Sequence, residues 1–253
     1  MLEAAIARIA GAYALRAYLP ASLAARILRN GLRRLRGKPA AAATQLPQVA
    51  WPQLLPNHPI RLIETAKSDG NVRLCELAIL ALAAREAAPG SEIIEIGTFD
   101  GRTALNLAIN APAGVPIATL DLPADQPSAL AIEQSERRYV DKPAPGARLR
   151  NCRDRWRADA GRVVQLQGDS ATFDWSPYLG RAGLVFVDGS HAYDYAKKDS
   201  ETAMRLVRPG GAVLSHDYGV WPGVTRALDE LEAARRLGLV NVRASSLVFW
   251  RAP

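Results

Sequence analysis

The sequence predicts an α/β fold in which a mostly parallel sheet ends in an antiparallel hairpin. From Ser91 onward, short runs rich in β-branched residues alternate with helical segments, which is typical of parallel strands joined by crossover helices. Near the end of the chain only Arg243 and Ala244 separate two such runs, and a connection this short permits antiparallel pairing alone. The 253 residues, of which 49% are hydrophobic and 23% charged, suffice for one domain of this kind with additional segments.

The expected elements define one domain at residues 46–253. Residues 46–90 form an N-terminal extension, which contains several prolines and then a helical pattern ending at Pro89 and Gly90. Residues 91–253 form the α/β core. The expected strands are residues 92–96, 117–120, 163–167, 184–187, 212–215, 239–242 and 245–250, and the expected helices are residues 72–88, 102–108, 194–207 and 224–236.

Residues 1–45 are expected to form a basic arm of amphipathic helices followed by a linker. Leu2, Ile6, Ile9 and Tyr13 recur at helical spacing. Residues 1–38 carry eight basic residues and one acidic residue, which accounts for the whole net charge of +7. The body of the protein is therefore neutral, and we expect no nucleic-acid partner. The arm can lie on an anionic membrane surface, dock on a partner or pack on the body with its arginines in water.

Two observations concern the compartment. No apolar run reaches the length of a membrane-spanning helix, and two cysteines, Cys75 and Cys152, give no sign of an oxidising environment. We expect a cytoplasmic protein, either free or held at the inner face of the membrane by residues 1–38. The sequence leaves a homo-oligomer open.

Glycines mark the first turn of the core. The run from Glu92 to Thr103 is a strand, a glycine turn and a helix start, with three residues between Gly97 and Gly101. A dinucleotide-binding turn has a different glycine spacing, and a carboxylate such as Glu95 would repel a pyrophosphate. An NAD-dependent oxidoreductase is therefore disfavoured, whereas Glu95 suits an ammonium group or a hydroxyl.

Further acidic residues follow the next two strands. Asp121 ends the second strand, where a carboxylate can accept hydrogen bonds from ribose hydroxyls. Asp169 and Ser170 follow the third strand, where they can face an adenine ring. Each acid alone is more often a loop or helix cap, but ligands bind at the carboxyl ends of such strands. Three acids at three successive strand ends therefore favour a nucleoside site.

Three segments carry a resemblance to a known family. They are Glu95-Ile96-Gly97-Thr98-Phe99-Asp100-Gly101, Phe186-Val187-Asp188-Gly189-Ser190-His191, and the stretch from Pro209-Gly210-Gly211 to His216-Asp217-Tyr218. From about Asp69 to Trp250 the chain resembles class I S-adenosylmethionine-dependent methyltransferases, in particular bacterial O-methyltransferases of sugars and macrolide sugars. Residues 1–45 lie outside the resemblance. It implies a Rossmann-like, seven-stranded sheet with the C-terminal hairpin and S-adenosylmethionine as cofactor. The cofactor residues that it implies are Glu95, Gly97, Thr98, Phe99, Gly101, Thr103, Asp121, Leu122, Asp169, Ser170 and Asp188.

Two histidines follow the fourth and fifth strands, close to aspartates. An imidazole can remove the proton of an alcohol, and the resemblance implies this role for His191. The alternative is that His191 caps the following helix. Asp188 and Asp217, with His216, offer ligands that favour Mg²⁺ or Mn²⁺. Related metal-dependent enzymes carry an acid where this chain has His216, so the metal stays open.

The function expected from these residues is methyl transfer to a hydroxyl of a sugar, a glycan or a similar small metabolite. The alternative is a membrane-associated binding protein that keeps a methyltransferase-like fold without catalysis. The connection from Pro123 to Gly161 is long and rich in arginine, so it can form either a mobile lid over an anionic acceptor or a solvated surface.

Overall fold

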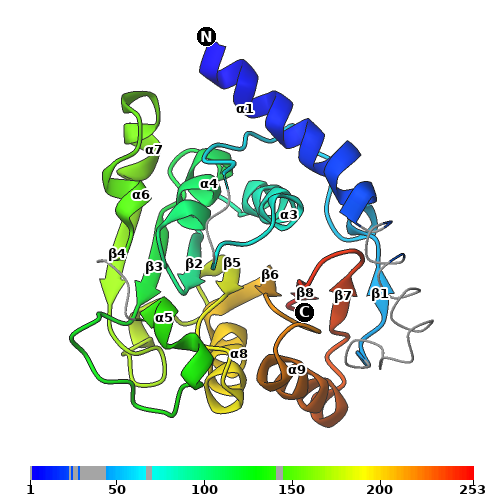
Figure 1. The fold of residues 1–253 in the computed structure, drawn as a ribbon, viewed down its shortest axis with the longest axis vertical. Helices are drawn as coiled ribbons and strands as arrows, with labels where there is room; N and C mark the ends of the chain where they lie inside the picture. Colours follow the sequence, from blue (N-terminus) through cyan, green and yellow to red (C-terminus); the bar gives the residue numbers. More distant parts are fainter. Residues whose placement is uncertain (1, 23, 25–27, 29–43, 67–69, 141–144) are drawn as a thin grey trace.

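One eight-stranded sheet organises the molecule (Figure 1). The computed structural model describes residues 2–22, 24, 28, 44–66, 70–140 and 145–253. The strand order across the sheet is β1-β7-β8-β6-β5-β2-β3-β4. The pairs from β6 to β4 are parallel, and β8 is antiparallel to both of its neighbours. The strands are β1 (Gln48–Val49), β2 (Glu92–Ile96), β3 (Ile117–Asp121), β4 (Val163–Gln167), β5 (Ala182–Val187), β6 (Val207–Ser215), β7 (Val240–Val242) and β8 (Val248–Arg251).

Helices cover both faces of the sheet (Figure 1). One layer contains α3 (Leu74–Arg85) and α4 (Arg102–Asn110), with α1 (Leu2–Tyr13) running across the end of the molecule. The other layer contains α8 (Tyr193–Leu206) and α9 (Pro222–Arg235). Each layer packs its own hydrophobic cluster against the sheet. In the described part of the connection between β3 and β4 the helical segments are short: 134–136, α5 (Arg137–Val140), α6 (Ala147–Arg150), 154–156 and α7 (Arg157–Ala160).

The predicted parallel core and C-terminal hairpin are confirmed, with two differences in detail. The loop between β7 and β8 has five residues instead of the two expected. Strand pairing starts later because Ser245 and Ser246 bond within the loop and to the buried Glu76, whose Oε1 accepts hydrogen bonds from the Ser246 N–H and hydroxyl, both at 2.8 Å. The eighth strand, β1, comes from the proline-containing extension and pairs in parallel with β7 over two residues. A strand this short leaves no alternating pattern in the sequence.

The N-terminal helix that the sequence predicts is present and packs on the body. The π-helical turn Ala14–Tyr18 continues α1, while most of the rest of the expected basic arm, residues 23, 25–27 and 29–43, lies outside the described residues. The Ala7 carbonyl accepts a hydrogen bond of 2.9 Å from the Leu62 N–H. Within the described part of the chain, no helix is both long and apolar enough to cross a membrane.

Gly11 sets how closely α1 approaches the body. A Cβ atom at this position would lie 2.7 Å from the Ile60 carbonyl oxygen, well inside van der Waals contact. We expect Gly11→Ala to destabilise the docking of α1 by about 1–3 kcal/mol, the usual cost of overpacking. This sign is opposite to the gain of up to about 1 kcal/mol that alanine gives in an unconstrained helix. Hydrogen exchange checks it: amides of α1 should exchange faster, and unchanged or slower exchange would contradict the close contact.

Candidate active site

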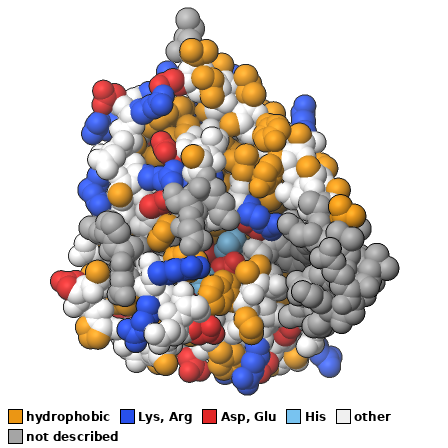
Figure 2. Space-filling view, in the orientation of Figure 1, with side chains coloured by type: hydrophobic (Ala, Val, Ile, Leu, Met, Phe, Trp, Pro, Cys, Tyr) orange, Lys and Arg blue, Asp and Glu red, His pale blue; other side chains and the backbone are white. Residues whose placement is uncertain are grey.

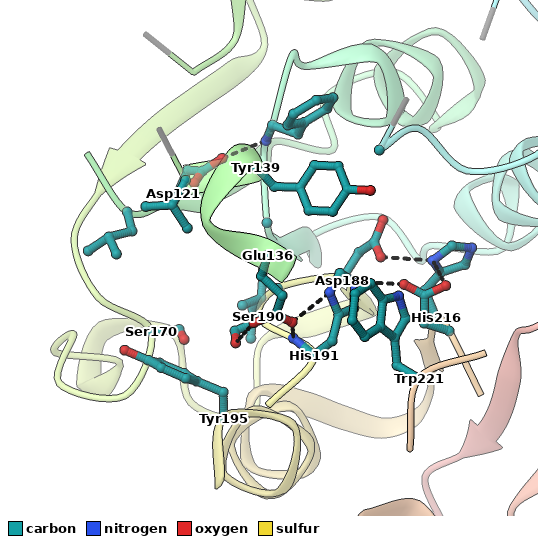
Figure 3. Close-up of a pocket in the computed structure, with 18 of the residues that line it drawn as sticks. Asp121, Glu136, Tyr139, Ser170, Asp188, Ser190, His191, Tyr195, His216 and Trp221 are labelled. Carbon is teal, nitrogen blue, oxygen red and sulfur yellow. Dashed lines mark hydrogen bonds and ion pairs between the residues drawn. The ribbon is translucent and has the colours of Figure 1, made fainter. Parts of the chain in front are cut away.

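A cavity of about 320 Å³ opens at the carboxyl ends of the parallel strands, within the range of small-ligand sites (Figure 3). Parallel strands present these ends at one edge of the sheet, so residues distant in sequence meet there. Seven of the predicted cofactor residues line the cavity together with the three predicted acceptor-side residues. They are Gly97, Phe99, Asp121, Leu122, Asp169, Ser170 and Asp188, with His191, His216 and Asp217.

Four predicted cofactor residues, Glu95, Thr98, Gly101 and Thr103, lie behind the cavity wall and do not line it. Glu95 is fully buried and accepts a hydrogen bond of 2.5 Å from the Thr119 hydroxyl at Oε2, while Oε1 has no hydrogen-bond partner among the described residues. Burial raises the pKa of Glu95 well above its usual range. The Thr98 hydroxyl also bonds to Thr119, at 2.7 Å. These side chains support the turn after β2 from beneath.

Gly97 joins the cofactor side of the cavity to the acceptor side. Its φ is 104°, and a Cβ atom there would lie 2.1 Å from the Asp188 carbonyl oxygen. The backbone after β2 therefore approaches the backbone after β5, and any side chain would force the two apart. Gly97 therefore allows the backbone of Asp188, in the same chain, to come close to the turn after β2.

The two carboxylates expected at the nucleoside lie in different settings. Asp121 lies at the end of β3, faces the cavity and accepts a hydrogen bond of 2.5 Å from the Phe99 N–H (Figure 3). Asp169 is 2% exposed, and its oxygens accept hydrogen bonds from the N–H groups of Ala129 (2.7 Å) and Ala171 (2.8 Å). The Tyr195 hydroxyl donates a third. Asp169 thus holds the loop, while Ser170 beside it lines the cavity.

His191 is held between carboxylates on both ring nitrogens (Figure 3). Nδ1 lies 2.6 Å from Glu136 Oε1 and Nε2 lies 2.7 Å from Asp217 Oδ2. The ring stacks on Trp221, with centroids 4.3 Å apart and planes 3° from parallel. Burial acts to lower the pKa of His191, but Asp217 and Glu136 outweigh it and raise the pKa to about 9. The alternative role as a helix cap is not observed, because α8 has Ala192 at its N-cap.

His216 is held in the same way on the other side of the cluster. Nδ1 lies 2.9 Å from Asp188 Oδ1 and 3.3 Å from Asp217 Oδ1, and Nε2 lies 3.3 Å from Glu76 Oε2. Burial acts to lower the pKa of His216, but these three carboxylates hold it well above its usual range. Burial likewise acts to raise the pKa of Glu76, but His216 and Arg73 hold it well below its usual range.

The cluster as a whole carries an excess of negative charge. The two histidines are surrounded by four carboxylates, Glu76, Glu136, Asp188 and Asp217, so even with both rings protonated and Arg73 counted the acids outnumber the cations. Such a site favours a cation or a hydrogen-bond donor.

The structure groups the candidate metal ligands differently from the sequence. Asp188, His191 and Asp217 offer ligand atoms that all lie within 4.8 Å of one another, so His191 stands with the two aspartates where the sequence predicted His216. Asp217 reaches this position in the left-handed region, with a φ of 65°, a conformation that aspartate tolerates better than most residues. Two carboxylates and one imidazole are hard or borderline donors that suit Mg²⁺ or Mn²⁺.

Sequence reasoning missed Glu136 and Glu76. Glu136 belongs to the connection after β3, and besides His191 Nδ1 it contacts the Ser190 hydroxyl (2.9 Å) and the backbone N–H of His191. Glu76 lies in α3, 140 residues before His216. Neither follows a strand, so no local signal separates them from surface acids. Their near-complete burial, at 3% and 0% exposed, is a tertiary property.

We expect the metal-free protein to show His191 titrating near pH 9 rather than near 6.5. A pKa raised by folding stabilises the native state fully below about pH 6.5, and this stabilisation is lost as pH rises through about 9. NMR titration of the histidine ring protons, assigned with His191→Gln, measures the pKa, and urea unfolding across this range measures stability. Glu136→Gln should lower the pKa of His191. A His191 pKa near 6.5 would show that the carboxylates do not hold the ring in solution.

Comparisons with known proteins agree with this architecture. A family model described as a methyltransferase domain matches residues 94–218. The O-methyltransferase NovP superposes with a TM-score of 0.57 at 17% identity, over 71% of this chain and 80% of that one. The calicheamicin methyltransferase CalS11 gives 0.51 at 16% identity (70% and 77%). The methyltransferase PaMTH1 of Podospora anserina, bound to S-adenosylhomocysteine, gives 0.50 at 17% identity (73% and 80%). A sequence search of curated proteins gives no match.

The matched residues 94–218 run from β2 through His216 and Asp217 and so include most of the cavity lining. The structural likeness, at this low identity, shows the shared fold, and the family model identifies the domain. Residues 94–218 therefore form a methyltransferase domain, and the chain is an S-adenosylmethionine-dependent methyltransferase.

Proposed function

We propose that the enzyme transfers a methyl group from S-adenosylmethionine to a hydroxyl of a sugar, a glycan or a similar small metabolite. The observation that carries the proposal is the shared cavity: the predicted nucleoside contacts and the His191–Asp217 pair face the same space. The cofactor supplies a sulfonium methyl group that is already activated for transfer. The protein must position the acceptor oxygen and remove its proton.

The cofactor side of the cavity fits an adenosyl group and an amino acid. Asp121 is placed to accept hydrogen bonds from ribose hydroxyls, and Ser170 lies further along the wall, where the adenine would extend. Gly97 and Phe99 bring the backbone after β2 to the cavity. The buried Glu95 carboxyl, with one oxygen lacking a hydrogen-bond partner among the described residues, lies behind this turn and supports it without lining the cavity.

His191 is the proposed base, and its contacts support Nε2 as the nitrogen that would accept the proton. Glu136 faces Nδ1 and also binds the backbone N–H of His191, so it holds the ring in one orientation. Nε2 faces Asp217 at the cavity and is the atom that would take the acceptor proton. With a pKa of about 9, however, the ring is protonated at neutral pH. A base must first lose this proton, so the carboxylates around the ring control the reaction.

A divalent cation would relieve this constraint. Asp188 and Asp217 would hold Mg²⁺ or Mn²⁺, whose charge would lower the pKa of a nearby hydroxyl, while the adjacent His191 would keep Nε2 for the acceptor proton. Engaging the two aspartates in metal binding would weaken their hold on the His191 proton and so lower its pKa.

Replacement of His191 tests the base. We expect His191→Ala to bind S-adenosylhomocysteine with unchanged affinity and to lose turnover by about 10²–10⁴-fold, the usual contribution of a positioned base. Calorimetry measures the first and a methyl-transfer assay the second. His58→Ala is the matched control, because His58 pairs with Glu86 at 2.8 Å on the exposed surface. Equal turnover in the two variants would remove His191 from the mechanism.

Metal addition tests whether a divalent cation assists the reaction. We expect Mg²⁺ or Mn²⁺ to lower the NMR pKa of His191 from about 9 and to shift the activity profile toward lower pH, with EDTA reversing both effects. Asp217→Asn should abolish the response to metal. A His191 pKa that does not change over a metal titration would exclude metal assistance.

The acceptor is tested with labelled cofactor. The enzyme is incubated with S-adenosylmethionine carrying a labelled methyl group and with cell-envelope glycans, nucleotide sugars or small phenols, with and without EDTA. Label in the glycans or nucleotide sugars supports a sugar hydroxyl as acceptor. Label in the phenols alone would overturn this part of the proposal while leaving O-methylation intact.

A further inference from the structure

The packing of α1 is inverted relative to an ordinary surface helix. Its own buried residues, Ala7 and Gly11, are small, while the turn that follows buries Ala14 together with Leu15. Its large apolar residues instead point into solvent, at exposures of 74%, 55%, 67% and 53% for Leu2, Ile6, Ile9 and Tyr13. A helix that only packs on its own protein places its large apolar side chains inward.

These four side chains form one stripe, because positions 2, 6, 9 and 13 share one side of a helix. Figure 2 shows hydrophobic side chains gathered along the upper right of the molecule, where α1 runs in Figure 1. Of the eight large hydrophobic side chains exposed in the described parts of the chain, five lie within residues 2–28. The exposed apolar surface is therefore concentrated on this segment rather than scattered.

The stripe is fixed in place by the body. Gly11 leaves no space for a side chain against Ile60, and the Ala7 carbonyl accepts the Leu62 N–H at 2.9 Å. A helix docked through its small-residue face cannot turn its large side chains inward without losing these contacts.

The charge of the segment indicates what covers the stripe. Arg8 and Arg16 are exposed on the same helical segment, and residues 1–38 carry eight basic residues against one acid. That acid, Glu3, is paired with Arg153 at 2.7 Å. A two-fold contact between copies would bring two such cationic segments together, because the same patch meets itself. An anionic lipid surface instead offers acyl chains in which the apolar stripe can be buried and negatively charged headgroups that attract the arginines.

We propose that the exposed face of α1, formed by Leu2, Ile6, Ile9 and Tyr13 with the flanking Arg8 and Arg16, binds an anionic membrane surface. The helix lies in the interface with its large apolar side chains among the acyl chains and its small-residue face still docked on the body. The enzyme is thereby peripheral to the membrane, and its binding weakens as salt rises.

Co-sedimentation of the full chain with vesicles tests this. We expect binding to vesicles of phosphatidylcholine mixed with phosphatidylglycerol, and weak or no binding to phosphatidylcholine alone. The double variant Ile6→Glu with Ile9→Glu should bind more than about tenfold more weakly, because each isoleucine contributes on the order of a tenfold gain when buried. Arg8→Gln with Arg16→Gln should reduce the salt dependence.

The matched control is Val164→Glu with Leu179→Glu, which adds the same charge at two exposed apolar residues outside the N-terminal segment, 54% and 39% exposed. It should bind vesicles much more tightly than the α1 double variant. All variants replace exposed side chains, so circular dichroism and binding of S-adenosylhomocysteine should be unchanged. Equal loss in the control and the α1 variant, or no preference for the anionic vesicles, would overturn the proposal. A second result would also overturn it: the native chain does not bind vesicles, and light scattering gives a lower mass for the α1 variant than for the native chain. That result would identify a second copy of the chain as the partner that covers the stripe.

Discussion

The pairing of two histidines with four carboxylates is the interaction on which the active site depends. His191 and His216 come from the ends of β5 and β6, whereas their partners include Glu76 from α3 and Glu136 from the connection after β3. The ion pairs therefore tie α3 and the long connection after β3 to the carboxyl edge of the sheet. The same pairing raises the pKa of His191 to about 9, because carboxylates face both of its ring nitrogens.

The close approach at Gly97 determines how the cofactor and acceptor halves of the cavity are joined. The turn after β2 lies against the backbone of Asp188, so residues that would hold the cofactor and residues that would act on the acceptor belong to one rigid wall. In-line methyl transfer requires the donor and acceptor atoms to be held within a narrow range of distance. Because Gly97 has no side chain, the loops after β2 and β5 pack directly against each other and can hold that geometry. The connection after β3 adds to it by placing Glu136 against His191.

The N-terminal helix α1 buries different kinds of side chains from the rest of the protein. The body packs its large apolar side chains inward, whereas α1 uses alanine and glycine for its inner face and leaves isoleucines outside. The excess of basic over acidic residues in the chain lies in residues 1–38, the segment that contains α1.

The sequence by itself determined the order of strands and crossover helices, the C-terminal hairpin and the strand ends that carry acids and histidines. These are local properties, because β-branched runs, glycine turns and residues directly after a strand are visible in short windows. It also placed Asp121, Asp188, His191 and Asp217 at one edge of the sheet, since parallel strands share that edge. Only the tertiary structure decided that Glu95 does not line the cavity and that His191 is grouped with the two aspartates as a candidate metal ligand. It alone also brought Glu76 and Glu136 to the histidines. Burial and ion pairing between elements more than 50 residues apart depend on how the layers pack, and no spacing along the chain records that.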